Sequence, residues 1–104
     1  MDYKYRGKVV CLTDTQNVIG GGITFNGVPL NAHAKKICLQ GEAYYIGNIE
    51  TADDNNTYIA IYNKDIRARS VREQIEIYMG WYHIEDFITL AEYRDIQINS
   101  ILDE

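Results

Sequence analysis

The 104-residue sequence has few of the features that mark membrane, secreted or multidomain proteins. Pro29 is its one proline, and no linker, repeat or low-complexity tract divides it, so we expect a single domain over residues 1–104. Its apolar runs are only a few residues long, which predicts no membrane-spanning helix. The opening MDYKYRGKVV lacks the apolar segment of a signal peptide, so we expect a cytoplasmic protein. Its two cysteines, Cys11 and Cys38, are then expected to be buried free thiols.

Positive charge is scarce as well. Ten Lys and Arg residues stand against fifteen Asp and Glu residues, which gives a net charge of −5 at pH 7. A negative surface repels nucleic acid and anionic lipid, so this balance favours neutral or basic partners. The basic residues gather only at Lys35–Lys36 and at Arg67, Arg69 and Arg72.

The segment VIGGGITFNGVPL, residues 18–30, holds four of the eight glycines and raises the question of a phosphate-binding loop. Such a loop needs a lysine directly after its last glycine and a helix behind it, because amides and lysine must converge on the phosphates. Here ITF follows Gly22, and Pro29 gives little sign of a helix. We therefore interpret the segment as an irregular loop that can serve as a binding surface.

Residue types that bind metals or perform catalysis are present but are not grouped. Of four possible zinc ligands, Cys11, His33, Cys38 and His83, only His33 and Cys38 approach the spacing of a structural zinc site. The carboxylate pairs, such as Asp53–Asp54, fall in predicted turns or at the end of the chain, where no paired acid–base function is indicated. We expect no metal, no cofactor and no catalytic centre.

Patterns of apolar, aromatic and β-branched residues predict strands in the first two thirds of the chain. A first strand is predicted over Lys8–Thr13, after which region 14–34 loses all periodicity and Lys36–Leu39 resumes an apolar run. Glu42–Glu50 and Thr57–Asn63 flank the polar stretch TADDNN and predict a β-hairpin.

The stretch that follows allows two interpretations before it becomes a strand. SVRE, residues 70–73, has the form of a capping box and predicts a short helix that stops at Gly80. Ile75 and Ile77 alternate as they would in a strand, so both structures remain open there. GWYHI, residues 80–84, predicts a strand that turns at Glu85–Asp86 into Phe87–Ile88.

The end of the chain predicts a helix over about residues 90–102. TLAE, residues 89–92, forms a second capping box at its start. The apolar side chains expected to share one face, or to lie beside it, are those of Leu90, Tyr93, Ile98 and Ile101.

Tyrosine is unusually common, with nine residues. On the second hairpin strand Ile59 and Ile61 are expected to face the core, which places Tyr58 and Tyr62 in a row on the opposite surface. Tyrosine is enriched at protein interfaces but also fills the interior of small barrels, so interface and core are about equally favoured.

This succession of a strand (Lys8–Thr13), a long glycine-rich loop, a hairpin and a closing GWYHIEDF segment resembles small phage and prophage proteins with a Src-homology-3-like β-barrel. The resemblance covers Lys8–Leu39 and Gly80–Leu90, whereas residues 66–79 and the final helix are additions to the pattern. It implies a mainly β, β-rich α+β fold: a small barrel over about residues 8–88 with a C-terminal helix. It also implies a scaffold for protein contacts without catalytic residues.

Two functional hypotheses follow. The first is a non-enzymatic protein-binding module that docks to a host protein, such as a defence or replication enzyme, as an inhibitor or adaptor. Its predicted contact residues are Ile23, Phe25, Tyr58, Tyr62, Trp81 and Tyr82. The alternative is a nucleic-acid- or nucleotide-binding barrel that uses Arg67, Arg69 and Arg72 together with surface tyrosines.

Overall fold

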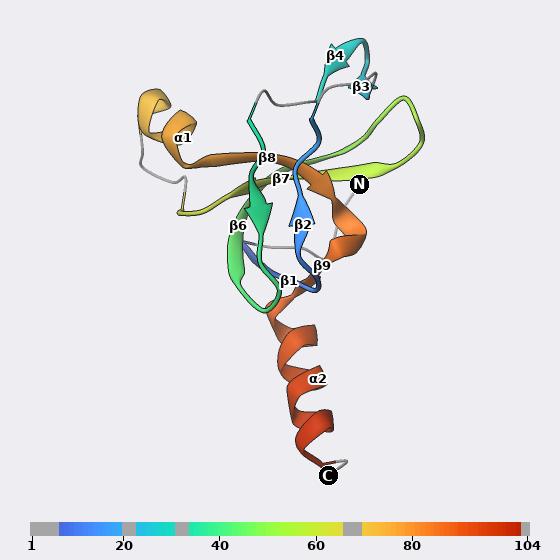
Figure 1. The fold of residues 1–104 in the computed structure, drawn as a ribbon, viewed down its shortest axis with the longest axis vertical. Helices are drawn as coiled ribbons and strands as arrows, with labels where there is room; N and C mark the ends of the chain where they lie inside the picture. Colours follow the sequence, from blue (N-terminus) through green and yellow to red (C-terminus); the bar gives the residue numbers. More distant parts are fainter. Residues whose placement is uncertain (1–6, 20–22, 31–33, 66–69, 103–104) are drawn as a thin grey trace.

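The computed structural model describes residues 7–19, 23–30, 34–65 and 70–102. Its main element is a five-stranded antiparallel sheet in the order β8-β7-β6-β1-β9 (Figure 1). These strands are β1 (Lys8–Cys11), β6 (Ala43–Thr51), β7 (Thr57–Tyr62), β8 (Tyr78–His83) and β9 (Phe87–Thr89). Strands β8 and β9 lie at the two edges, and the described sheets do not close into a barrel. The predicted β-rich α+β fold is confirmed.

The segment between β1 and β6 is more regular than predicted. It contains two small antiparallel sheets, in which β2 (Thr15–Gln16) pairs with β5 (Ile37–Cys38) and β3 (Thr24–Phe25) pairs with β4 (Val28–Pro29). Asn26 and Gly27 both have positive φ, 50° and 78°, as in a two-residue hairpin turn. The irregular region predicted over 14–34 is therefore wrong in part, and the Asn-Gly pair is the sequence signal that marks this hairpin.

The long β6–β7 hairpin confirms the clearest prediction from the sequence. Its strands pair from Tyr45 opposite Tyr62 to Thr51 opposite Thr57, and the polar stretch forms the connecting turn. In that turn the Asp54 carboxylate accepts a hydrogen bond of 3.0 Å from the Asn56 backbone N–H. This local bond stabilises the reversal of the chain.

Apolar side chains pack on both faces of the main sheet. On one face, Ile59 and Ile61 of β7 point into the core, as predicted. The buried cluster there consists of Val9, Cys11, Cys38, Tyr44, Ile59, Ile61, Tyr82 and Phe87. On the other face a second buried cluster consists of Val18, Leu30, Ala52 and Tyr58. Burial of each large apolar side chain contributes about 1.5–3 kcal/mol to folding, so both clusters stabilise the sheet.

The tyrosine row predicted on the outer surface is wrong for Tyr58, and Tyr82 is not a surface residue either, because both side chains are fully buried. Tyr58 is covered by the segment between β2 and β5, which contributes Val18 and Leu30. Tyr82 points to the opposite face, where its ring meets that of Phe87 edge-on, with 5.8 Å between the ring centroids. Of the two tyrosines in the predicted row, only Tyr62 is partly exposed.

One carboxylate at the tip of the β6–β7 hairpin holds the β3–β4 hairpin. Asp53 accepts hydrogen bonds from the Thr24 hydroxyl and from the backbone N–H groups of Asn26, at 3.3 Å, and Gly27, at 3.5 Å. The Asp53 N–H donates to the Thr24 carbonyl at 2.6 Å. The Thr24 hydroxyl is the main group that lowers the pKa of Asp53. These bonds form a clasp between the two hairpins.

Helix α1 (Val71–Ile77) follows from the first capping box. The Ser70 hydroxyl accepts a hydrogen bond of 3.2 Å from the Glu73 N–H. The helix ends before Gly80, the predicted stop, and the chain passes directly into β8. The open choice at Ile75 and Ile77 is thus resolved as a helix, and the strand predicted from Gly80 begins two residues earlier, at Tyr78.

Gly80 lies inside β8 and has a different role from the one predicted. Its φ is 117°, and the register between β7 and β8 shifts beside it. A Cβ atom at this position would lie 2.9 Å from Nδ2 of Asn17, so the absence of a side chain allows a close approach. After β8 the predicted turn is the 3₁₀ helix η1 (Ile84–Asp86), which leads into β9.

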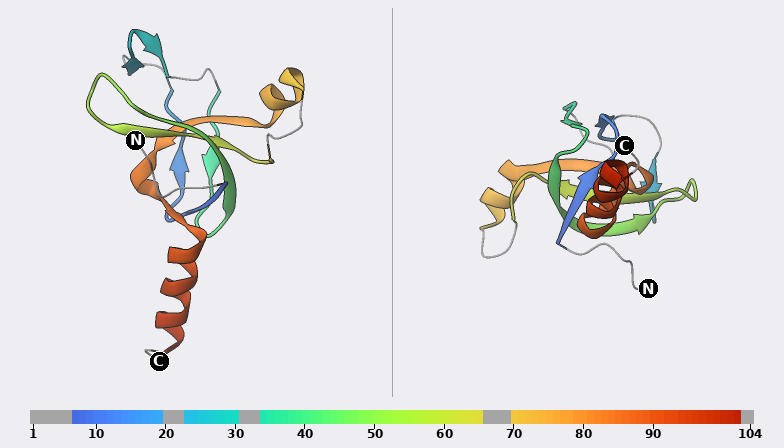
Figure 2. Two further views of the ribbon diagram at one scale, coloured as in Figure 1. Left: turned by 180° about the vertical axis from the view of Figure 1, so that it is seen from behind. Right: turned by 90° about the horizontal axis from the view of Figure 1, so that it is seen from below.

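Helix α2 (Leu90–Leu102) occupies the predicted residues and begins at the second capping box. The Thr89 hydroxyl accepts from the Glu92 N–H at 3.1 Å, and Glu92 Oε1 accepts from the Thr89 N–H at 3.3 Å. The helix starts beside β1 and β9 and then extends away from the strands (Figures 1 and 2). Ile98 is exposed, so the predicted apolar face is not covered there. No helix among the described residues is long and apolar enough to cross a membrane.

We predict that Gly80→Ala destabilises the protein more than Gly27→Ala. Both glycines have positive φ, so alanine is strained at both positions, but only at Gly80 would the new Cβ meet a side chain, that of Asn17. We expect losses of about 1–3 kcal/mol for Gly80→Ala and about 1 kcal/mol for Gly27→Ala, measured by urea unfolding. Equal losses would show that the Asn17 contact contributes nothing.

We predict that the Asp53 clasp opens in acid. Because its hydrogen bonds lower the folded-state pKa, the clasp stabilises the hairpin above the unfolded pKa, about 3.9, and is lost as pH falls through the folded pKa. In an NMR titration the Asn26 and Gly27 amide signals should move with a midpoint below 3.8, the ordinary aspartate value. Asp53→Asn should abolish this transition, and Asp95→Asn on α2 should not. A midpoint at or above the ordinary value would contradict the clasp.

Candidate binding groove

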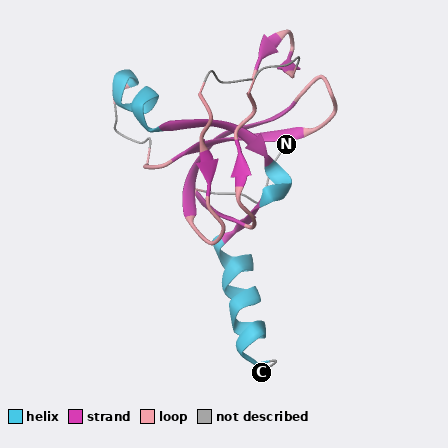
Figure 3. Cartoon of the chain, viewed as in Figure 1, coloured by secondary structure: helices cyan, strands magenta, loops and turns pink. Residues whose placement is uncertain are grey.

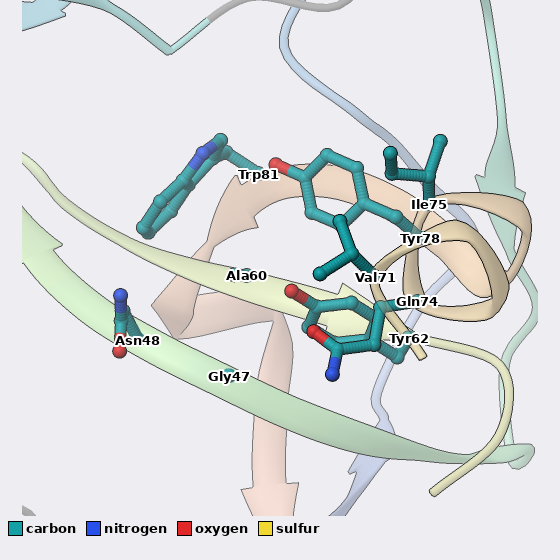
Figure 4. A pocket seen from close by; sticks show the side chains of 9 residues that line it. All are labelled: Gly47, Asn48, Ala60, Tyr62, Val71, Gln74, Ile75, Tyr78 and Trp81. Atoms are coloured by element: carbon teal, nitrogen blue, oxygen red, sulfur yellow. The ribbon is translucent and has the colours of Figure 1, made fainter. Parts of the chain in front are cut away.

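A groove lies between α1 and the face of the sheet that carries the tyrosine row (Figure 4). Its volume is about 380 Å³, and it is open to solvent. It is lined by residues of β6, β7, α1 and β8, namely Gly47, Asn48, Ala60, Tyr62, Val71, Gln74, Ile75, Tyr78 and Trp81. Figure 3 shows α1 at the margin of the strands and well apart from α2. Val71, Gln74 and Ile75 of α1 form one side of the groove.

Three aromatic rings line the groove, those of Tyr62, Tyr78 and Trp81. The rings of Tyr62 and Tyr78 have centroids 5.2 Å apart and are tilted by 50°, and Figure 4 shows the Trp81 indole beside the Tyr78 hydroxyl. Burial, together with a smaller effect of the nearby Tyr62 phenol, raises the pKa of Tyr78 to about 12, although a hydrogen bond with Trp81 opposes the shift. The Tyr78 phenol therefore stays neutral at physiological pH.

Gly47 determines where the Tyr62 ring can lie. A Cβ at Gly47 would lie 2.8 Å from Cε2 of Tyr62 and 3.3 Å from Cβ of Ala60. The φ of Gly47 is not in the left-handed region, so this glycine is needed for space rather than for backbone conformation. It also lies where the β6–β7 register shifts between Ile46 and Ile49, as at a β-bulge. A glycine inside a predicted strand is the signal that could have located the groove.

Helix α1 exposes two branched apolar side chains along the groove. Val71 is 74% exposed and Ile75 is 69% exposed, and the two lie one helical turn apart. Exposed apolar side chains that adjoin one another at a groove are typical of interaction sites. Ile75 and Ile77, two residues apart, therefore lie in different environments, because Ile75 is exposed and Ile77 is buried.

The described groove lining carries no formal charge. Its polar groups are the side-chain amides of Asn48 and Gln74, the tyrosine hydroxyls and the indole N–H. Helix α1 also carries Arg72, Glu73 and Glu76; the side chains of Arg72 and Glu76 approach to 3.7 Å and are largely exposed. The groove can thus hold apolar or flat polarisable groups, and its oxygen atoms can accept hydrogen bonds.

The residues predicted as a contact face divide into two groups. Tyr62 and Trp81 line the groove. Ile23 and Phe25 are half-buried and pack with Trp81 against the second core cluster, so Trp81 contributes to both the core and the groove. The remaining two, Tyr58 and Tyr82, are fully buried and present no surface.

The second predicted surface, the arginine cluster, is described only in part. Arg67 and Arg69 lie outside the described residues. Arg72 is exposed beside Glu76, which offsets its charge. Sequence reasoning missed Gly47, Asn48, Val71, Gln74, Ile75 and Tyr78 as groove residues, because their proximity depends on how α1 folds back beside the sheet.

Possible metal ligands are not brought together in the described parts of the chain. Among those residues no three His, Cys, Asp or Glu side chains are placed to hold a metal ion. The His83 ring lies against the Tyr58 ring, with 4.8 Å between centroids, and His33 lies outside the description. Cys11 and Cys38 are free thiols in the first core cluster, which confirms the prediction that they are buried.

We predict that neither thiol reacts in the folded protein. Burial raises the pKa of Cys11 and raises that of Cys38 to about 12, so the reactive thiolate is scarce and inaccessible. At about pH 8, iodoacetamide should modify both residues at least about tenfold more slowly in the folded protein than in urea, as followed by mass spectrometry. Rapid modification of either residue in the folded protein would contradict this packing.

Comparison of the chain with models of known protein families gives no match, and searches of curated proteins and of solved structures find no match either.

Proposed function

We propose that the protein is a cytoplasmic, non-enzymatic binding module, encoded by a phage or another mobile element, that docks to a host protein. In this proposal it acts as an inhibitor or adaptor of an enzyme of defence or replication. The observation that carries the proposal is the groove beside α1, where exposed apolar side chains adjoin three aromatic rings.

The groove has the physical properties of a protein-docking site. Val71 and Ile75 face water in the free protein, and covering each with a partner would contribute about 1.5–3 kcal/mol. Tyr62, Tyr78 and Trp81 add large contact areas with few rotatable bonds, which limits the entropy lost on binding. An extended segment or a helix of a partner could bury both sets of side chains together.

The order of elements supports the proposed relationship to the Src-homology-3-like phage proteins. Strand β1, a long segment, the β6–β7 hairpin and the β8–η1–β9 run follow one another as the resemblance implies. Helices α1 and α2 are the additions to that pattern. Because α1 supplies one wall of the groove, the proposed site depends on an element that the resemblance does not provide.

Charge supports a particular kind of host protein. The chain carries a net charge of −5, so it is attracted to the basic surfaces of enzymes that act on nucleic acid. Long-range attraction of this kind accelerates encounter, whereas the uncharged groove provides contacts that persist after docking. We therefore expect salt to slow association more than it accelerates dissociation.

We predict that peptides selected from a random display library bind the groove. Val71→Gln and Ile75→Gln keep a helix-forming residue on α1 but remove its exposed apolar groups. Each substitution should weaken binding of the selected peptides by about tenfold, measured by biolayer interferometry.

Ile96→Gln provides the matched control, because Ile96 is an isoleucine on α2 that is also exposed and lies outside the groove. It should leave affinity unchanged. Peptides that bind all three variants equally well would overturn the groove as the docking site. A salt-sensitive gel shift with single-stranded DNA, without peptide binding, would favour the nucleic-acid alternative instead.

A further inference from the structure

We infer that the groove receives an arginine side chain of the partner, with the guanidinium held against the rings of Tyr62, Tyr78 and Trp81. This inference rests on the proposed function and specifies the chemistry of the segment that docks. It follows from the kind of surface that lines the groove, from the charge of the chain and from the way in which Gly47 positions one ring.

The first step concerns the rings. The face of an aromatic ring carries partial negative charge and attracts a cation within about 6 Å, and tryptophan does so most strongly. The ring centroids of Tyr62 and Tyr78 lie 5.2 Å apart, and Figure 4 shows the Trp81 indole beside the Tyr78 hydroxyl. Together they offer three neighbouring π-systems to a group bound in the groove.

The second step concerns charge. None of the described lining residues is charged, so no basic side chain of the lining repels a cation. No carboxylate of the lining pairs with one either, so the rings must provide the attraction. The chain as a whole carries −5, which favours entry of a positive group and disfavours a negative one. Contact with the rings shields the bound cation in part from water, which strengthens its attraction to them.

The third step distinguishes arginine from lysine. A guanidinium is planar, only weakly hydrated and able to stack on an aromatic face while its N–H groups point outward in the ring plane. The side-chain amide oxygens of Asn48 and Gln74 lie on the groove lining and can accept such hydrogen bonds. An ammonium is compact and strongly hydrated, so it would lose more solvation for fewer contacts.

Gly47 explains why the groove can accept a flat group. Because this residue has no side chain, the Tyr62 ring lies directly over β6, where a methyl group would come within 2.8 Å of the ring. Alanine at this position must displace the ring. The residue therefore controls one face of the proposed guanidinium site without touching the ligand through a side chain.

Trp81 is the only tryptophan, so its fluorescence reports directly on the groove. We propose to titrate the full-length protein with four capped tripeptides whose central residue is arginine, citrulline, lysine or glutamate. The arginine peptide should cause a saturable change, and the citrulline peptide, which has nearly the same shape without the charge, should bind at least about tenfold more weakly. Lysine should lie between them, and glutamate should cause no saturable change.

Two substitutions test the geometry. Gly47→Ala should weaken arginine binding by about tenfold, and Tyr62→Leu, which keeps apolar volume but removes the π-face, should do the same. Gly27→Ala, in the β3–β4 turn and away from the groove, is the control and should have no effect. Tyr62→Leu keeps the test valid if Gly47→Ala fails to fold, which thermal melting would reveal.

The outcomes separate this inference from the proposed function. Equal binding of the arginine and citrulline peptides, or tighter binding of the glutamate peptide, would overturn the arginine site. Display-selected peptides that require Val71 and Ile75 but contain no arginine would overturn it as well, while leaving the protein-docking proposal intact. Arginine binding that is lost in Tyr62→Leu, together with peptides that ignore α1, would instead support the site and contradict the docking proposal.

Discussion

The structure depends on one buried amide, that of Asn17. This side chain is only 3% exposed, and both of its ends bond to the segment that precedes β5, because Nδ2 donates to the Ala34 carbonyl at 3.0 Å and Oδ1 accepts from the Lys36 N–H at 2.9 Å. The same side chain packs against Gly80, where no Cβ intervenes. Residues between β1 and β6 are thereby fastened to the edge strand β8. A buried polar group left unpaired costs about 1–3 kcal/mol, so this amide specifies where the long segment must lie.

The abundance of tyrosine serves this attachment as well. Tyr44 accepts a hydrogen bond from the Leu39 N–H at 2.9 Å, Tyr58 donates to the Asp54 carboxylate at 2.8 Å, and Tyr82 donates to the Lys36 carbonyl at 2.9 Å. In each case the ring fills the core while the hydroxyl, at the end of the ring, bonds to a loop. A phenylalanine would fill the same space but leave those loop groups without this partner. At least three of the nine tyrosines therefore hold irregular chain against the sheet.

Local signals in the sequence predicted local structure well. The β6–β7 hairpin, the C-terminal helix and its capping box depend on residues close together in the chain, and each is confirmed. Of the first capping box, the bond to the Ser70 hydroxyl is confirmed. What failed depends on distant residues: alternation correctly separated Ile59 from Tyr58 but could not reveal that Val18 and Leu30 would bury the tyrosine. The groove was predicted only through Tyr62 and Trp81, because its lining joins β6, β7 and β8 to α1. Gly80 illustrates the same limit, since its pattern suits a helix end until Asn17 is seen beside it.

The groove and the second core cluster are two parts of one apolar surface. Along β7, Tyr58 is covered by the long segment, whereas Ala60 and Tyr62 on the same face line the groove. Trp81, opposite Ala60 on β8, lies at the boundary and packs against both, and the Val18 N–H donates to its carbonyl at 2.9 Å. The covered end is held by folding, so the rings at the open end are positioned before any partner arrives. Such preorganisation reduces the entropy cost of binding, because the protein does not have to order those side chains on association. The same bonds that stabilise the fold therefore prepare the surface on which the proposed function depends.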